Sequence, residues 1–256
     1  MTQATARTAS HQSKLVRLLG ELTGTEVAGA SSDFAERLGQ MFGFNEALIL
    51  SAANTHRPTT TGTPLTDTAR QAQIETLEAE ILQARARLVA AIVKSCTPGA
   101  GPTRIKLPVV AASAEGEPLA YEPFQRFHAT HQREMHWHLR NLQASVRNAV
   151  SLVSPQLKQL ALLDAAFDEI LQERARKLFN LIPTLLHKRF TQLQDAHRQS
   201  QSSTVPDEPA VWLRPGGWLA RFCGELQALL LAELDVRLQP VLGLVDALRH
   251  EVQTQP

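Results

Sequence analysis

Two long helical patterns joined by a tight break decide the fold, and together they read YEPFQRFHATHQREMHWHLRNLQASVRNAVSLVSPQLKQLALLDAAFDEILQERARKLFNLIPTLLHKRFTQLQDAHR (residues 121–198). In the first pattern, apolar and histidine side chains recur at three- and four-residue steps. At about 100° per residue these steps place them on one side of a helix. The set comprises Phe124, Phe127, His128, His131, Met135, His138, Leu142, Val146, Ala149 and Val153. We therefore predict an amphipathic helix that buries this stripe.

The second pattern begins directly after the break. Ser154 suits the N-cap of a helix, and Pro155 suits the first helical position, where its missing N–H has no helical partner to lose. Apolar side chains then follow at helical steps: Leu157, Leu160, Leu163, Phe167, Ile170, Leu171, Leu178, Leu181 and Leu185. Because the break is so short, we expect an antiparallel hairpin. Pro183 lies inside the second pattern and predicts a kink or a break there.

Composition supports a helical protein with a real core. The chain has 256 residues, of which 43% are hydrophobic and only 5% aromatic, so it fits one large domain or two small ones. We predict an all-α fold of elongated antiparallel helical hairpins, forming a bundle with coiled-coil character. The remaining segments are predicted in chain order: residues 1–12 disordered, 13–55 a small helical N-terminal unit, 56–66 a linker, 67–97 a coiled-coil-like helix, 98–120 a Pro/Gly-rich loop, 199–217 a second linker, and 218–254 a C-terminal helix packed on the hairpin.

Two of these segments leave structural alternatives open. Heptad-like apolar positions in 67–97 need a partner helix, which is either the central hairpin or a second copy of the protein. These positions are Ile74, Leu77, Ile81, Ala84, Leu88 and Ala91. Within the loop, residues 105–110 fit a short edge strand or an extended arm.

The cysteines and the hydropathy pattern bear on the compartment. Cys96 and Cys223 lie far apart with no CxxC motif, which favours buried thiols in a reducing cytosol over a disulfide. No apolar run approaches the roughly 20 residues needed to span a bilayer. Residues 1–13 lack the apolar core of a signal peptide. We expect a soluble, cytoplasmic protein that is not inserted in the membrane.

Four arginines are the candidate residues for binding a protein partner or nucleic acid. Arg126, Arg133, Arg140 and Arg147 are spaced by seven, opposite the apolar stripe, so they form one row about 30 Å long. They either bridge to acids on neighbouring helices, such as Asp168, Glu169 or Glu173, or contact phosphates or an acidic partner groove. A formal net charge of +1 argues against a generally basic nucleic-acid binder but permits such a local row.

No constellation predicts catalysis or a cofactor. His128, His131 and His138 share a face with Met135, yet no Cys, Asp or Glu completes a metal site on that face, so core or interface histidines are favoured. The chain has no Gly-rich phosphate loop after a strand, no G-x-S-x-G motif and no Cys–His pair in a recognisable frame. We predict a non-enzymatic protein without a metal or cofactor.

Four segments carry a family resemblance: FAERLGQMFGFNEALILSAA (34–53), YEPFQRFHATHQREM (121–135), SPQLKQLALLDAAFDEILQERARKLFNLIPTLLHKRF (154–190) and FCGELQALLLAELDVRLQPVLGLVDAL (222–248). Together they resemble an uncharacterised proteobacterial family of helical proteins. Its members are encoded beside flagellar-stator-like channel proteins and OmpA-like peptidoglycan-binding proteins, including the type III Zorya anti-phage system. The resemblance implies a soluble accessory of a proton-driven membrane machine and carries over no catalytic residues.

These observations lead to one expected function and one alternative. We expect a cytoplasmic interaction component of a stator-like defence complex, which presents helix faces to a protein partner and which can also form a homo-oligomer. The alternative is an effector that binds nucleic acid through the row from Arg126 to Arg147.

Overall fold

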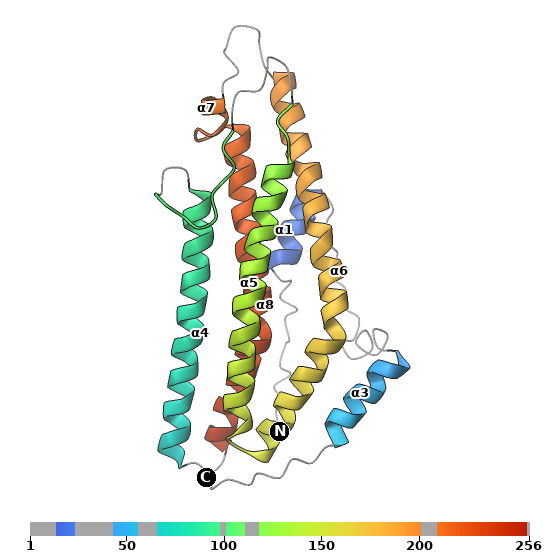
Figure 1. The fold of residues 1–256 in the computed structure, drawn as a ribbon, viewed down its shortest axis with the longest axis vertical. Coiled ribbons are helices and arrows are strands. Elements are labelled where there is room, and N and C mark those ends of the chain that lie inside the picture. Colours follow the sequence, from blue (N-terminus) through green and yellow to red (C-terminus); the bar gives the residue numbers. More distant parts are fainter. Residues whose placement is uncertain are drawn as a thin grey trace, which may run out of the picture.

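The structure, a computed structural model, is an elongated bundle of helices (Figure 1). It describes residues 14–23, 43–55, 66–97, 101–110, 118–200 and 209–254. The helices within these ranges are α1 (Lys14–Thr23), α3 (Phe44–Thr55), α4 (Asp67–Cys96), α5 (Glu122–Ser151), α6 (Pro155–Ser200), α7 (Pro209–Trp212) and α8 (Trp218–Thr254). No strand occurs in these ranges, so the all-α fold class is confirmed. The segment predicted to be disordered, 1–12, lies outside the described residues, as do positions 56–65, 98–100, 111–117 and 201–208 of the predicted linkers and loop.

The hairpin of α5 and α6 breaks where the sequence predicts it. Helix α5 ends at Ser151 and α6 begins at Pro155. The backbone N–H of Leu157 donates to Ser154 Oγ at 3.1 Å, which is the N-cap hydrogen bond. At the other end of the pair, the Tyr121 hydroxyl donates to the carbonyl of Pro183 at 3.0 Å. Helix α6 continues through Pro183, so of the two outcomes predicted there the helix break is wrong.

Helix α8 lies at the centre of the bundle and packs against α1, α4, α5, α6 and α7. Its sequence is apolar on nearly all sides, which is typical of a helix surrounded by others. The core forms two clusters along the bundle. One contains Phe124, Phe190 and Phe222, and the other contains Val146 and Val245.

Helix α4 packs against α8 and α5 of the same chain (Figure 1). Its buried side chains follow the predicted heptad positions in part: Ile74, Leu77, Ile81, Leu88, Ile92, Ser95 and Cys96. Of the two predicted partners, the hairpin supplies α5, and the C-terminal helix α8, which neither alternative named, supplies the other contact. Burial of this apolar stripe requires no second copy.

The first two described helices join the bundle separately. Helix α1 contacts α6 and α8, whereas α3 contacts α6, and the described residues of α1 and α3 do not contact each other. Residues 24–42 of the predicted small helical unit spanning 13–55 lie outside the described residues, so the unit stays a prediction. Helices of ten and twelve residues are marginal alone, and each packs on a longer neighbour. Leu15 of α1 is buried in this way, whereas Leu48 and Ile49 of α3 stay exposed.

Residues 101–110 form an extended arm without strand pairing. Ile105, Leu107 and Val110 pack against the first core cluster, and Arg104 pairs with Glu134 of α5 at 3.1 Å. Both cysteines are buried and free, as predicted. Among the helices in the described ranges, none combines the length and apolarity required to cross a membrane.

Candidate functional site

The predicted arginine row divides into two parts in the structure. Arg126, Arg133 and Arg140 are exposed on the outer side of α5. Within the described part of the chain, no carboxylate pairs with any of these three. Arg133 Nη2 donates to the Thr130 hydroxyl at 3.0 Å, a contact within α5 itself. These three guanidinium groups are therefore available to a partner.

Arg147, at the end of the row, is held by α6. Its Nε donates to Asp164 Oδ2 at 2.5 Å and its Nη2 lies 3.2 Å from Asp168 Oδ2. Only 18% of its side chain is exposed. Asp168 was one of the acids that the sequence offered for such a bridge, and Asp164 is the closer partner. The structure thus assigns Arg147 to the α5–α6 contact and leaves three arginines on the surface.

An exposed tryptophan lies among these arginines. Trp137 is 62% exposed, and it follows Arg133 by four residues and precedes Arg140 by three. Side chains three and four apart on a helix are neighbours, so the position of Trp137 along α5 lies between those of Arg133 and Arg140. Its ring meets the His138 ring edge-on, with centroids 4.7 Å apart. Trp137 is not among the residues predicted from the sequence to bind a partner, although its helical spacing from Arg133 and Arg140 was a signal for it.

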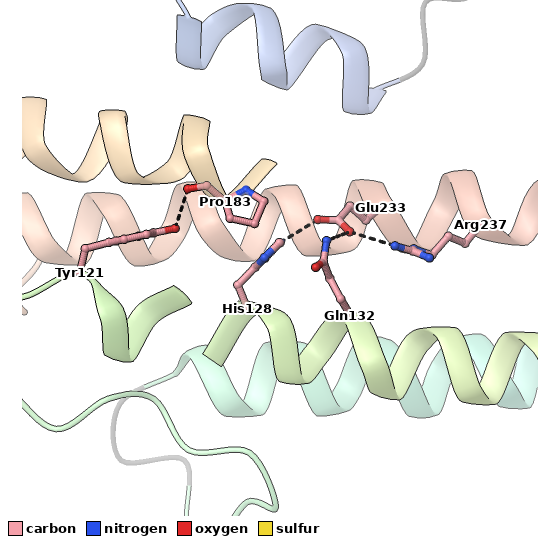
Figure 2. Close-up of polar contacts among 6 residues, drawn as sticks. All are labelled: Tyr121, His128, Gln132, Pro183, Glu233 and Arg237. Carbon is pink, nitrogen blue, oxygen red and sulfur yellow. Dashed lines mark hydrogen bonds and ion pairs between the residues drawn. The ribbon is translucent and has the colours of Figure 1, made fainter. Parts of the chain in front are cut away.

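The three histidines have different environments. His128 and His131 are buried, as predicted, whereas 43% of the His138 side chain is exposed. The prediction that His138 belongs to the buried stripe is therefore wrong, and the adjacent Leu139 is the buried residue at this level of α5. Figure 2 shows His128 directed from α5 toward Glu233 of α8, with His128 Nε2 2.8 Å from Glu233 Oε1.

Glu233 gathers donors from both helices (Figure 2). Gln132 Nε2 donates to Glu233 Oε2 at 2.9 Å, and Arg237 Nη2 lies 3.6 Å from the same oxygen. The guanidinium of Arg237 also lies 3.8 Å from the centre of the Phe179 ring. Burial lowers the pKa of Arg237, and the Glu233 carboxylate opposes that effect. Glu233 is 0% exposed, so this cluster holds α5 and α8 in register and offers no surface for a substrate.

His131 belongs to a second polar contact, at the edge of a cavity. Its Nε2 lies 2.8 Å from Ser95 Oγ on α4. Burial and the charge of His128 lower the pKa of His131 to about 4, which keeps the ring neutral at physiological pH. A cavity of about 370 Å³ lies beside this pair, between α4, α5 and the 101–110 arm. No group of three or more His, Cys, Asp or Glu residues in the described ranges is arranged to hold a metal ion.

Comparison with known proteins yields a family and no closer relative. No curated protein and no solved structure matches the chain. One family model, described as a protein of unknown function (DUF3348), matches residues 1–250. Since the match covers nearly the whole chain, including all of the described helices except the last four residues of α8, the chain belongs to the DUF3348 family.

Proposed function

We propose that this protein acts without catalysis, as an interaction component that binds a protein partner through the outer face of α5. The binding surface consists of Arg126, Arg133, Trp137 and Arg140, and we call it the Arg–Trp face. The observation that carries the proposal is the 62% exposure of Trp137 between two arginines that no described carboxylate neutralises.

The physical argument begins with the cost of exposing an indole. A tryptophan facing water forgoes the burial of a large apolar surface. Trp and Arg are also the side chains most enriched among the residues that dominate protein–protein binding energy. A central indole with cationic neighbours suits a partner with an apolar pocket rimmed by carboxylates. We therefore propose an acidic protein surface as the occupant of the Arg–Trp face.

The resemblance described above supplies the proposed setting. Its relatives are encoded beside stator-like channel proteins, and a Zorya-type defence complex in the cytoplasm is accordingly where we propose that the Arg–Trp face acts. Nucleic acid remains the alternative occupant, because indole rings also stack on bases and arginines also contact phosphates. The small net charge of +1 and the loss of Arg147 to the α6 contact both favour a protein.

Co-expression with the proteins encoded beside this chain tests the proposal. The complex is isolated by affinity purification and its mass is measured by light scattering. Trp137→Ala, and separately Arg133→Glu combined with Arg140→Glu, should each weaken the complex by a factor of about 10 or more, the loss typical of a residue that dominates an interface. Lys177→Glu, which reverses an exposed cation on α6, is the matched control and should leave the complex intact.

Two outcomes would contradict the proposal. The first is a complex whose stability is unchanged by both Arg–Trp face variants. The second is absence of any complex together with binding to DNA or RNA. In that case the logarithm of the association constant for nucleic acid should fall with the logarithm of the salt concentration with a slope of about −2.7, the value for three phosphate contacts. That result would support nucleic acid as the occupant of the Arg–Trp face.

A further inference from the structure

The cavity between α4, α5 and the 101–110 arm has the size of a small-molecule site. Its volume of about 370 Å³ falls in the range of ligand pockets, which begins at about 300 Å³. Its walls are mainly apolar, and the side chains that form them are Leu88, Ala91, Ile92, Ile105 and Met135. An apolar ligand body of matching shape would lose its contact with water here.

Cations dominate the rim of this cavity. Arg87 and Lys94 both line it from α4, and both are exposed with no described carboxylate as a partner. Arg104 of the arm also lines it but is neutralised by Glu134 at 3.1 Å. Glu134 is the only carboxylate among the lining residues, so the rim carries a net positive charge. An anionic group on the ligand would be attracted to Arg87 and Lys94.

A buried polar group adds to the apolar wall. His131 lines the cavity with only 2% of its surface exposed. The Ser95 hydroxyl lies 2.9 Å from the carbonyl oxygen of Ile92 and 2.8 Å from His131 Nε2, so a hydrogen bond joins the ring to α4. A neutral imidazole suits an apolar cavity better than an imidazolium would.

We propose that this cavity is a binding site for an amphipathic organic anion, with the apolar body between α4, α5 and the arm and the anionic head beside Arg87 and Lys94. The chemical class is a linear or compact carboxylic acid of the fatty-acid type. The proposal is independent of the Arg–Trp face, which lies on the outer side of α5. The proposed site would bind a small molecule, in addition to the protein partner proposed for the Arg–Trp face.

Titration calorimetry of the full chain with decanoate, decanol and decylammonium tests this site, because the three probes share one tail and differ in head charge. We expect one decanoate to bind per chain, saturably. Decanol should bind at least about tenfold more weakly, since two exposed cations each contribute a modest attraction to the carboxylate. Binding of decylammonium should be undetectable. Arg87→Glu combined with Lys94→Glu should weaken decanoate binding about tenfold or more. Lys106→Glu combined with Lys177→Glu makes the same charge change at exposed positions outside the cavity and should leave binding unchanged.

Ala91→Trp locates the binding. Ala91 lines the cavity but is exposed, so a larger side chain there fills the space without entering the core. It should abolish decanoate binding while the helical circular dichroism stays unchanged, and Ala91→Leu, a smaller change, should weaken it. The proposal is overturned if decanoate does not bind, if decanol binds equally well, or if binding persists in Ala91→Trp.

Discussion

His128 Nε2 lies 2.8 Å from Glu233 Oε1, and this contact joins α5 to α8 across 105 positions of the sequence. Both side chains are 0% exposed. Removing a carboxylate from water is costly, so Glu233 is tolerable in the core because His128, Gln132 and Arg237 compensate for its lost hydration. The free energy of unfolding should therefore respond strongly when this carboxylate is deleted.

Glu233→Leu should destabilise the protein by about 3–5 kcal/mol, because it leaves Gln132 and the buried Arg237 guanidinium without their acceptor. The midpoint and slope of urea unfolding, followed by circular dichroism, measure the change. Arg249→Leu, which removes exposed ion pairs with Glu78 and Asp246, should lower the free energy of unfolding far less and serves as the control. A loss below about 1 kcal/mol for Glu233→Leu would show that the cluster contributes little.

Substitution of two arginines of the same row, Arg147 and Arg140, should change the free energy of unfolding by different amounts. Arg147→Ala breaks hydrogen bonds to the half-buried Asp164 and should cost about 1.5–3 kcal/mol. Arg140→Ala removes an exposed side chain with no described partner and should change the free energy of unfolding by less than about 0.5 kcal/mol. Thermal unfolding of both variants under one set of conditions makes the comparison. Equal losses would contradict the division of the row.

His131 should make stability depend on acid pH. Its pKa is about 4 in the fold, below its ordinary value of 6.5, mainly because of burial and secondly because of His128. Between these two values the unfolded chain binds a proton that the folded chain does not, so this contribution to stability is lost as pH falls from about 6.5 to about 4. The full loss is about 3 kcal/mol.

His131→Gln removes the titrating group and provides the comparison. The variant should be less stable than the original protein at pH 7, because it disturbs the contact with Ser95. That difference should shrink as pH falls from 6.5 to 4, since only the original protein has the histidine to protonate on unfolding. Urea unfolding at a series of pH values measures it. A difference that is constant with pH would rule out the lowered pKa.

The two thiols should be unreactive in the folded protein. Burial raises the pKa of Cys96 to about 11 and, with a further contribution from Cys96, that of Cys223 to about 12. At pH 8 a disulfide reagent such as Ellman's should label neither thiol in the native state and both in urea, because the thiolate is the reactive form. Ser145→Cys, at an exposed position of α5, should be labelled at once in the folded protein. Rapid native labelling without that substitution would contradict the buried environment.

Local signals in the sequence predicted the framework of the fold. Ser154 and Pro155 identify the turn between α5 and α6 because capping and proline geometry depend on adjacent residues only. The apolar stripe of α5 follows from helical periodicity in the same way, and so does the helical run of α4. Helix propensity acted locally in these segments, and the packing agreed with it.

The contacts between helices could not be predicted from the sequence and are known only from the structure. Periodicity placed Arg147 in a uniform row, but only the register of α5 on α6 shows that Asp164 lies against it. Glu233 is an acidic residue inside a strongly apolar helix, and this indicates that its side chain has a buried polar partner. The sequence does not identify that partner. The cavity next to His131 depends on where the 101–110 arm crosses α4 and α5, and no periodicity encodes that crossing.

The central place of α8 has a consequence for synthesis on the ribosome. The surfaces of α4, α5 and α6 that α8 covers have been translated before α8 emerges, because it is the last of the described helices in the chain. Until then these leucine- and phenylalanine-rich faces lack their main cover, a state that favours aggregation or capture by chaperones. Nascent chains arrested before Trp218 should therefore stay bound to chaperones, and release should follow once the final helix has left the exit tunnel.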